Sequence, residues 1–239
     1  QEALKNRTAA TQEKEPLSKR LSVTSDVYYD GSNENLSATI TVEDAIKKML
    51  GESNNVAANV LMKSLGGVSD FTSKANKNGY KNTNVKAYYS SGAMGLNKSS
   101  IGDQANAMDH IFTTDGAGYS VAKSALQGAT DHYGVGGKAR KWAGNSMVAG
   151  SVAMFSVGGS DYIVGLYYEG NYDSQKAKDA VKDATKDLVA AITSGSSAGV
   201  SGKAVGDLPA GGKDVGASWY DGPGTQGSVG VDLAGTFSY

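Results

Sequence analysis

Apolar residues recur at helical spacing along most of the chain, and capping or breaking residues bound each apolar stripe. Over residues 41–50 the apolar positions fall three and four apart, which places them on one helical face. Thr41 precedes this stripe and Asp44 follows three residues later, the spacing of a capping box, and Gly51 supplies a stop. Similar patterns predict helices at about 55–65, 68–78 and 101–112, a short helix at 120–126 and a long one at 173–193.

Strand patterns are fewer. Leu21–Tyr29 is rich in β-branched and aromatic residues and ends in a turn. Met147–Phe155 and Tyr162–Tyr168 flank Gly158–Asp161, a pattern that predicts a β-hairpin. In the long helix at 173–193, small and aliphatic residues form the stripe that we expect to be buried, and alternating Asp and Lys form a solvated face.

The chain divides by composition into a domain, a linker and a tail. Its 239 residues suffice for one domain with a real core. We assign this domain to residues 1–193, with part of its N-terminal region expected upstream of the chain. Residues 194–213 are rich in Ser, Gly and Ala, which is typical of a flexible linker. Residues 214–239 are aromatic and turn-rich; we interpret them as the start of a truncated second domain or as a strand that pairs elsewhere.

Charge and cysteine content exclude several classes of function. The net charge of −1 and the pI of about 6.2 offer no basic field for nucleic acid. There is no cysteine, so disulfides and thiolate metal sites are excluded. No apolar run is long enough to span a membrane. The chain starts at Gln1 without a visible signal peptide, so we expect the native N-terminus upstream and membrane attachment only through an anchor there.

Candidate chemistry lies at the junction of the first two predicted helices. Ser53, Asn54 and Asn55 are small polar residues between two apolar helices. Polar side chains held at such a helix junction can point toward a bound ligand. The alternative is that Ser53 and Asn55 merely cap the second helix, because Ser and Asn are favoured at that position.

This junction resembles the S-D-N element of serine β-lactamases and penicillin-binding proteins. Leu65-Gly66-Gly67 resembles the L-G-G landmark of that family, and Gly79 with Thr83 resembles its G-x-x-x-T landmark. The predicted hairpin and last helix match the closing elements of the same fold. The resemblance covers about residues 15–193 and implies an α/β (α+β) fold, with an antiparallel sheet flanked by helices and a flexible C-terminal tail.

The resemblance implies roles for individual residues. Ser53 would relay a proton to the leaving group and Asn55 would hold the acyl side chain of the substrate, while Asn54 would face away. The lysine of the K-[ST]-G motif, which attracts the substrate carboxylate, would be Lys138. Ala139 lacks the hydroxyl of that motif and Arg140 replaces its glycine, and sliding the motif to start at Lys141 fits no better. The alternative is a basic surface loop.

The nucleophile motif of the family, S-x-x-K, is not found upstream of Ser53. The one S-x-x-K runs from Ser120 to Lys123, in the wrong order for the family, and we interpret it as part of an ordinary helix. The resemblance therefore implies that the first two strands and the nucleophile helix precede residue 1. No acidic residue lies in Tyr88–Asn97, where class A β-lactamases carry their deacylating Glu, so efficient antibiotic hydrolysis is not expected.

Two hypotheses follow. The first is an extracytoplasmic bacterial serine hydrolase of the cell envelope, which transfers acyl groups from D-Ala-D-Ala-like peptides or β-lactams. The second is a catalytically inactive relative that binds peptidoglycan or serves in surface assembly, with residues 214–239 engaging a protein partner. We predict no metal or organic cofactor, and the two histidines, His110 and His132, are not spaced as a metal-binding pair.

Overall fold

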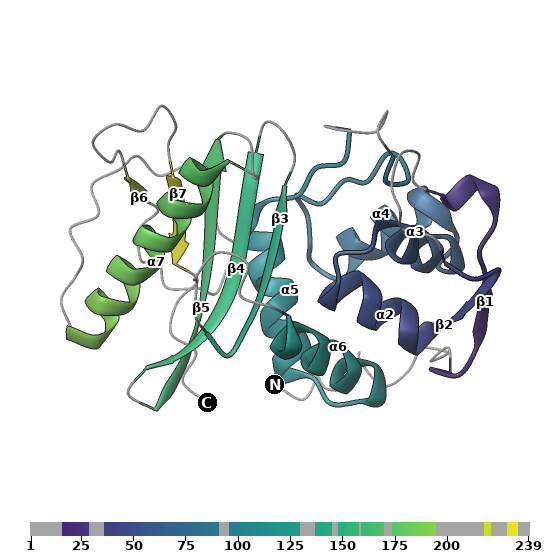
Figure 1. The fold of residues 1–239 in the computed structure, drawn as a ribbon, viewed down its shortest axis with the longest axis horizontal. Coiled ribbons are helices and arrows are strands. Elements are labelled where there is room, and N and C mark those ends of the chain that lie inside the picture. Colours follow the sequence, from purple (N-terminus) through teal and green to yellow (C-terminus); the bar gives the residue numbers. More distant parts are fainter. Residues whose placement is uncertain are drawn as a thin grey trace.

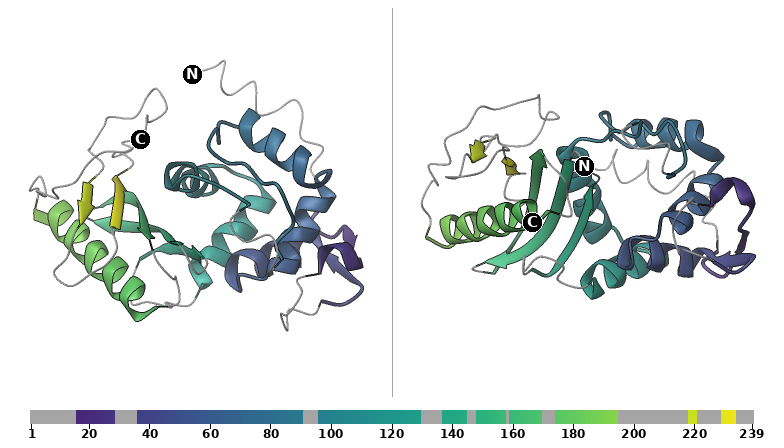
Figure 2. Two further views of the ribbon diagram at one scale, coloured as in Figure 1. Left: turned by 90° about the horizontal axis from the view of Figure 1, so that it is seen from above. Right: turned by 45° about the horizontal axis from the view of Figure 1, so that its top comes forward.

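A central antiparallel sheet lies beside a helical region in this computed structural model (Figure 1). The structure describes residues 16–28, 36–90, 96–129, 137–144, 148–157, 159–169 and 174–194, with the strands at 218–220 and 229–233. Helices cover both faces of the sheet (Figure 2). The arrangement confirms the predicted fold class, an antiparallel sheet flanked by helices.

The helices agree closely with those predicted from the apolar pattern. They are α2 (Val42–Gly51), α3 (Asn55–Ser64), α4 (Gly67–Lys77), α5 (Ile101–Thr113), α6 (Ala117–Gly128) and α7 (Gln175–Ser194). The predicted cap at Thr41 is present, since the Asp44 N–H donates to Thr41 Oγ1 at 3.0 Å, and α5 has the same contact, from the Asp103 N–H to Ser100 Oγ at 3.0 Å. Local side-chain chemistry therefore fixes where α2 and α5 begin.

The first strand is shorter than predicted. Within Leu21–Tyr29, strand β1 covers only the first positions, since β1 (Arg20–Ser22) pairs antiparallel with β2 (Thr39–Thr41). A short 3₁₀ turn, η1 (Ser25–Val27), follows. The pairing starts with Arg20 opposite Thr41, where β2 runs directly into helix α2, and ends with Ser22 opposite Thr39.

The predicted hairpin is confirmed. Strands β4 (Val148–Val157) and β5 (Ser160–Glu169) pair antiparallel, with Val157 opposite Ser160 at the closing end. Gly159 in the connecting turn has φ of 85°, a left-handed conformation that favours glycine.

The segment before the hairpin, for which a basic surface loop was the alternative, is a loop at the exposed Lys138 and a strand from Ala139 onward. Residues from Ala139 onward form β3 (Ala139–Gly144), which pairs antiparallel with β4 and is the edge strand of the sheet. A lysine and an arginine in its sequence, which disfavoured a strand on propensity alone, are tolerated because edge strands commonly carry charged residues.

The C-terminal tail contributes strands to the same sheet. The strand order is β3-β4-β5-β7-β6, with β6 (Ser218–Tyr220) and β7 (Val229–Leu233). Strand β7 pairs antiparallel with β5, with Val164 opposite Leu233. The structure thus pairs part of the tail within the sheet. Of the predicted linker, Ser194 is the last residue of α7 and residues 195–213 lie outside the described residues.

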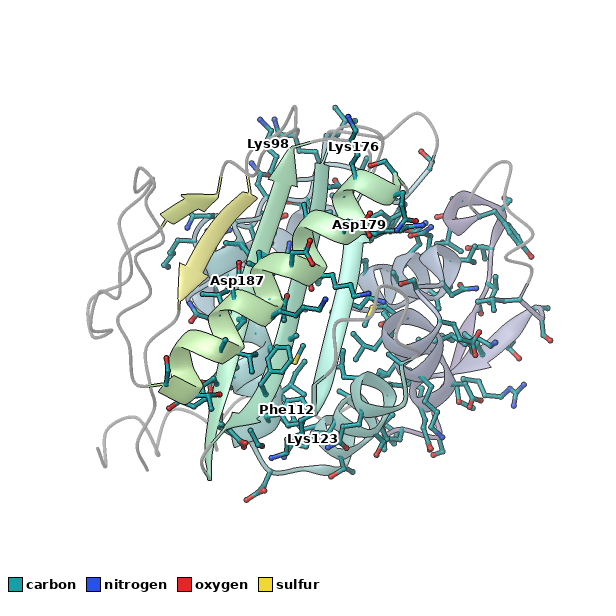
Figure 3. The ribbon with its side chains drawn as sticks, turned by 60° about the vertical axis from the view of Figure 1, so that its left-hand side comes forward. Lys98, Phe112, Lys123, Lys176, Asp179 and Asp187 are labelled. Atoms are coloured by element: carbon teal, nitrogen blue, oxygen red, sulfur yellow. The ribbon has the colours of Figure 1, made fainter. Side chains whose placement is uncertain are left out.

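Alternation along the sheet builds two separate cores. Ala153 and Val164 face α7 and pack against its buried stripe, whereas Val152 and Ile163 face α5 and α6. The other face of α7 is exposed to solvent, as predicted. Lys176, Asp179 and Asp187 lie along it (Figure 3). A third core joins α2 and α3 to β1 and β2.

Candidate functional site

The junction between α2 and α3 leaves the Ser53 side chain available for chemistry. Asn54, not Ser53 or Asn55, caps α3, because its Oδ1 accepts the Ala57 N–H at 2.8 Å. The Asn54 N–H is also engaged, donating to the Lys48 carbonyl at 3.0 Å. Ser53 is exposed and has φ of 57°, a conformation that non-glycine residues rarely adopt. The backbone therefore turns sharply at the serine of the motif.

Lys141 of β3 reaches this junction from the sheet. Its Nζ lies 2.6 Å from Ser53 Oγ. The same Nζ lies 3.0 Å from each of the Met49 and Leu50 carbonyl oxygens, in the last turn of α2. Ser53 and Lys141 are 88 positions apart in sequence, so only the packing of α2 beside β3 brings them together.

The register of the sheet explains why Lys141 is the lysine that arrives there. Lys141 is opposite Val152 and Ala139 is opposite Met154, so both β3 residues share the sheet face that packs against the helical region. Burial on this face lowers the pKa of Lys141 from 10.5 to about 8, because the charged ammonium is separated from water.

Lys138, the lysine predicted from the motif, lies elsewhere. Its Nζ forms an exposed ion pair with Asp161 at 2.8 Å, across the start of the hairpin. Hydrogen bonds from Lys138 and then Ser156 lower the pKa of Asp161. Lys138 precedes Lys141 by three residues, about 10 Å along an extended strand. The structure thus brings Ser53 together with Lys141 and gives Lys138 an acidic partner.

Asn55 starts the helix that forms one wall of the site, and a second asparagine one turn later holds the neighbouring loop. Asn59 is fully buried. Its Oδ1 accepts the Tyr89 N–H at 2.7 Å, and its Nδ2 donates to the Tyr89 carbonyl at 2.9 Å and to the Val27 carbonyl at 3.1 Å. Sequence reasoning missed Asn59. A polar residue on the apolar stripe of a predicted helix was the available signal.

The two family landmarks downstream have structural roles. Gly66 and Gly67 have φ of 101° and 87°, which turns the chain from α3 into α4. Thr83 Oγ1 donates to the buried Asp103 carboxylate at 2.8 Å, and the Asn82 N–H donates to the same oxygen at 2.8 Å. These contacts fix the loop that follows α4 to the start of α5.

The S-x-x-K sequence on α6 does not form a serine–lysine pair. Ser120 Oγ donates to the Gly116 carbonyl at 3.1 Å, and Lys123 Nζ donates to the Thr114 carbonyl at 3.1 Å. Both side chains are therefore hydrogen-bonded to backbone carbonyls, which agrees with the prediction that this sequence is part of an ordinary helix.

Of the two histidines, only His110 lies within the described residues, on α5 beside α6. His110 contacts Tyr119 OH at 3.0 Å, and His132 lies outside the described residues. Among the described side chains, no cluster of His, Cys, Asp and Glu could hold a metal ion. None of the helices in the described segments is long and apolar enough to cross a membrane.

Solved structures with this fold are numerous, although their sequences are distant. A PBP-A variant, solved as an acyl-enzyme complex with penicillin G, has a TM-score of 0.66 and 17% identity over 75% of this chain and 73% of its own. A β-lactamase from Burkholderia vietnamiensis has a TM-score of 0.63 and 18% identity over 74% of each chain. A class A β-lactamase from Mycobacterium abscessus has a TM-score of 0.62 and 18% identity over 80% of each chain.

Comparison at the sequence level gives the family. A search of curated protein sequences finds no significant match. The sequence profile of the β-lactamase enzyme family, however, matches residues 7–192, which include α2 to α6, most of α7 and the Ser53–Lys141 contact. By this match, and in agreement with its fold, the chain belongs to the β-lactamase enzyme family.

Proposed function

We propose that the protein is an extracytoplasmic serine hydrolase of the cell envelope, which transfers acyl groups from D-Ala-D-Ala-like peptides or β-lactams. The single observation that carries the proposal is the 2.6 Å contact between Ser53 Oγ and Lys141 Nζ. It places a hydroxyl and an amine with a lowered pKa in one exposed junction, the combination that acyl transfer by a serine enzyme requires.

In this proposal each residue of the junction has a chemical task. Ser53 Oγ and Lys141 Nζ exchange protons with the reacting groups, and Lys141 in its charged form attracts the carboxylate that both substrate classes carry. Asn55, at the first turn of α3, binds the acyl side chain through its amide. Lys138 is the second candidate for the carboxylate, about 10 Å further along the strand direction.

Covalent labelling tests this function. The protein should become labelled by a fluorescent penicillin, and unlabelled penicillin or a D-Ala-D-Ala peptide should compete. Comparing Lys138→Ala with Lys141→Ala decides which lysine binds the substrate carboxylate. We expect Lys141→Ala to give the larger loss of labelling. A folded protein that takes no label and hydrolyses no β-lactam would contradict the proposed reaction.

The second candidate function is a non-catalytic module that binds peptidoglycan or a protein partner. The observation that favours it is that Ser120 and Lys123 of the S-x-x-K sequence do not form a serine–lysine pair. Both side chains are hydrogen-bonded to backbone carbonyls instead. Binding of the folded protein to isolated peptidoglycan without release of D-Ala would support this function. Deleting residues 214–239 tests the partner role; assembly that survives the deletion would count against it.

A further inference from the structure

Positive charge gathers on one part of the helical region, on α4 and the segment that follows it. Residues 71–102 contain no aspartate, glutamate or arginine. Five lysines lie in this stretch, all of them exposed, and we call them the basic surface: Lys74, Lys77, Lys81, Lys86 and Lys98. The net charge of −1 for the whole chain conceals this excess, because acidic residues elsewhere balance it.

The fold places these lysines on three backbone segments that pack side by side. None of the residues of α4 is fully buried, so the helix lies at the surface. Thr72 of α4 holds the following segment, since its Oγ1 donates to the Val85 carbonyl and accepts the Val85 N–H, each at 2.9 Å. The backbones of Asn84 and Lys98 then exchange hydrogen bonds at 2.8 and 2.9 Å. Lysines up to 24 positions apart in sequence, from 74 to 98, are therefore gathered on neighbouring segments.

The lysines of the basic surface form no ion pairs within the described part of the chain. Lys74 and Lys81 donate to backbone carbonyls, and the Nζ groups of the other three have no partner among the described residues. Lysines elsewhere on the helices pair with carboxylates: Lys47 with Glu43, Lys48 with Glu52, Lys63 with Asp26 and Lys186 with Asp183. The positive charge of the basic surface is thus left for a partner outside the chain.

The acidic residues that flank this stretch do not neutralise it. Asp70, in the first turn of α4, has its carboxylate beside Gly66, at the start of the helix. Asp103 is buried, and its Oδ2 accepts hydrogen bonds from the Asn82 N–H and Thr83 Oγ1, both at 2.8 Å. Neither carboxylate forms an ion pair with a lysine of the basic surface.

We propose that the basic surface docks the protein on an anionic lipid bilayer. Clusters of about four to eight lysines and arginines are typical of protein segments that bind such membranes, and each one near the membrane strengthens binding about fivefold. This contact is peripheral, so it is distinct from the upstream anchor that the sequence leads us to expect. It goes beyond the proposed function, because it concerns where the protein attaches and not which reaction it catalyses.

An exposed leucine among the lysines favours a bilayer over a soluble polyanion. Leu96 is 46% exposed and lies two residues before Lys98, at the outer edge of the molecule (Figure 3). Asn97, between them, directs its side chain to the backbones of Lys86 and Ala87, which leaves its two neighbours exposed. An apolar side chain beside basic ones can enter the boundary between headgroups and acyl chains, whereas a polyanion in water offers it no apolar contact.

The kind of cation points the same way. Arginine presents a planar fork that binds individual phosphate groups in a fixed geometry, and residues 71–102 contain none. Lysine is a compact point charge on a flexible stem, which suits the diffuse negative potential of a bilayer.

Sedimentation with lipid vesicles tests the proposal. The wild-type protein should bind vesicles of phosphatidylglycerol and phosphatidylcholine and should not bind vesicles of phosphatidylcholine alone. Raising the ionic strength from about 0.05 to about 0.5 M should release it, because salt screens the charges. The triple variant Lys77→Gln/Lys86→Gln/Lys98→Gln removes the three lysines without partners and should bind about 100-fold more weakly.

A second triple variant provides the matched control. Lys47→Gln/Lys48→Gln/Lys186→Gln removes the same charge from α2 and α7, and it should bind within about threefold of wild type. An equal loss of binding in both triple variants would overturn the proposal, since the total charge and not the basic surface would then control binding.

Three further outcomes would overturn the proposal: no sedimentation of the folded wild type with phosphatidylglycerol vesicles, equal binding to uncharged vesicles, or binding that persists at high salt. Binding to polyphosphate or to a single-stranded oligonucleotide without binding to vesicles would assign the basic surface to a soluble polyanion and contradict the bilayer. Labelling by a fluorescent penicillin is measured separately, so a failure of membrane binding leaves the proposed function standing.

Discussion

Replacing Lys141 with methionine should change how the free energy of unfolding depends on pH. Methionine has a similar length and no charge, so the variant removes the titrating group while retaining much of the side-chain volume. It also removes the three hydrogen bonds of Nζ, to Met49, Leu50 and Ser53. That loss shifts the stability by an amount that varies little with pH, so the pH dependence isolates the charge.

The size of the effect comes from the burial of the amine. The Lys141 pKa is lowered from 10.5 in its ordinary state to about 8 in the folded protein. Between these values the unfolded chain holds a proton that the folded protein has lost, so wild-type stability rises with pH. The full difference corresponds to about 3 kcal/mol, gained as pH rises from 8 to 10.5 and absent below about pH 7.

Urea unfolding measured from pH 6 to about 10.5 checks this reasoning. Wild type should gain about 3 kcal/mol relative to Lys141→Met over the upper part of that range. Lys123→Met, which removes a lysine bonded to the Thr114 carbonyl, provides the comparison for loss of a lysine on a helix. A wild-type minus Lys141→Met difference that stays constant from pH 7 to about 10.5 would refute the burial argument.

Other changes test the scaffold around the site. Asn59→Ala should destabilise the fold by about 3 kcal/mol, because it removes three hydrogen bonds to the Val27 and Tyr89 backbone; equal urea midpoints would contradict this. Gly165→Ala should cost about 1–3 kcal/mol in thermal unfolding, since its Cβ would lie 2.8 Å from Ile101 Cγ1, and Gly118→Ala, with no atom within 4 Å, is the control. Truncation after residue 213 should lower the melting temperature, because β5 loses the pairing with β7; an unchanged temperature would show that this pairing adds no stability.

Local patterns predicted the helices and the hairpin because their causes are local. The caps at Thr41 and Ser100 depend on residues three positions apart, and the apolar stripe of α7 depends on spacing within one helix. The turn at Gly159 needs only a residue that tolerates positive φ. Such features are visible before any tertiary contact forms.

Strand β3 was not predicted, and a strand in residues 214–239 was only one of two interpretations, because pairing partners, more than composition, decide short strands. β3 carries Arg140 and Lys141, and its backbone is held by β4, a neighbour that composition does not reveal. Which of Lys138 and Lys141 contacts Ser53 is likewise decided by strand pairing. Moving by one position along a strand exchanges its two faces, so the face that meets α2 follows from the register with β4.

The sequence by itself determined the polar junction Ser53-Asn54-Asn55, the helices on either side of it and, through the order of its landmarks, the family resemblance that the sequence profile confirms. Only the tertiary structure decided that Asn54 performs the capping, that Asn59 holds the loop at Tyr89 and that Lys141 meets Ser53. The physical reason is range: a cap or an apolar stripe is set within a few residues, whereas a contact between side chains 88 positions apart exists only once the sheet and the helices have packed.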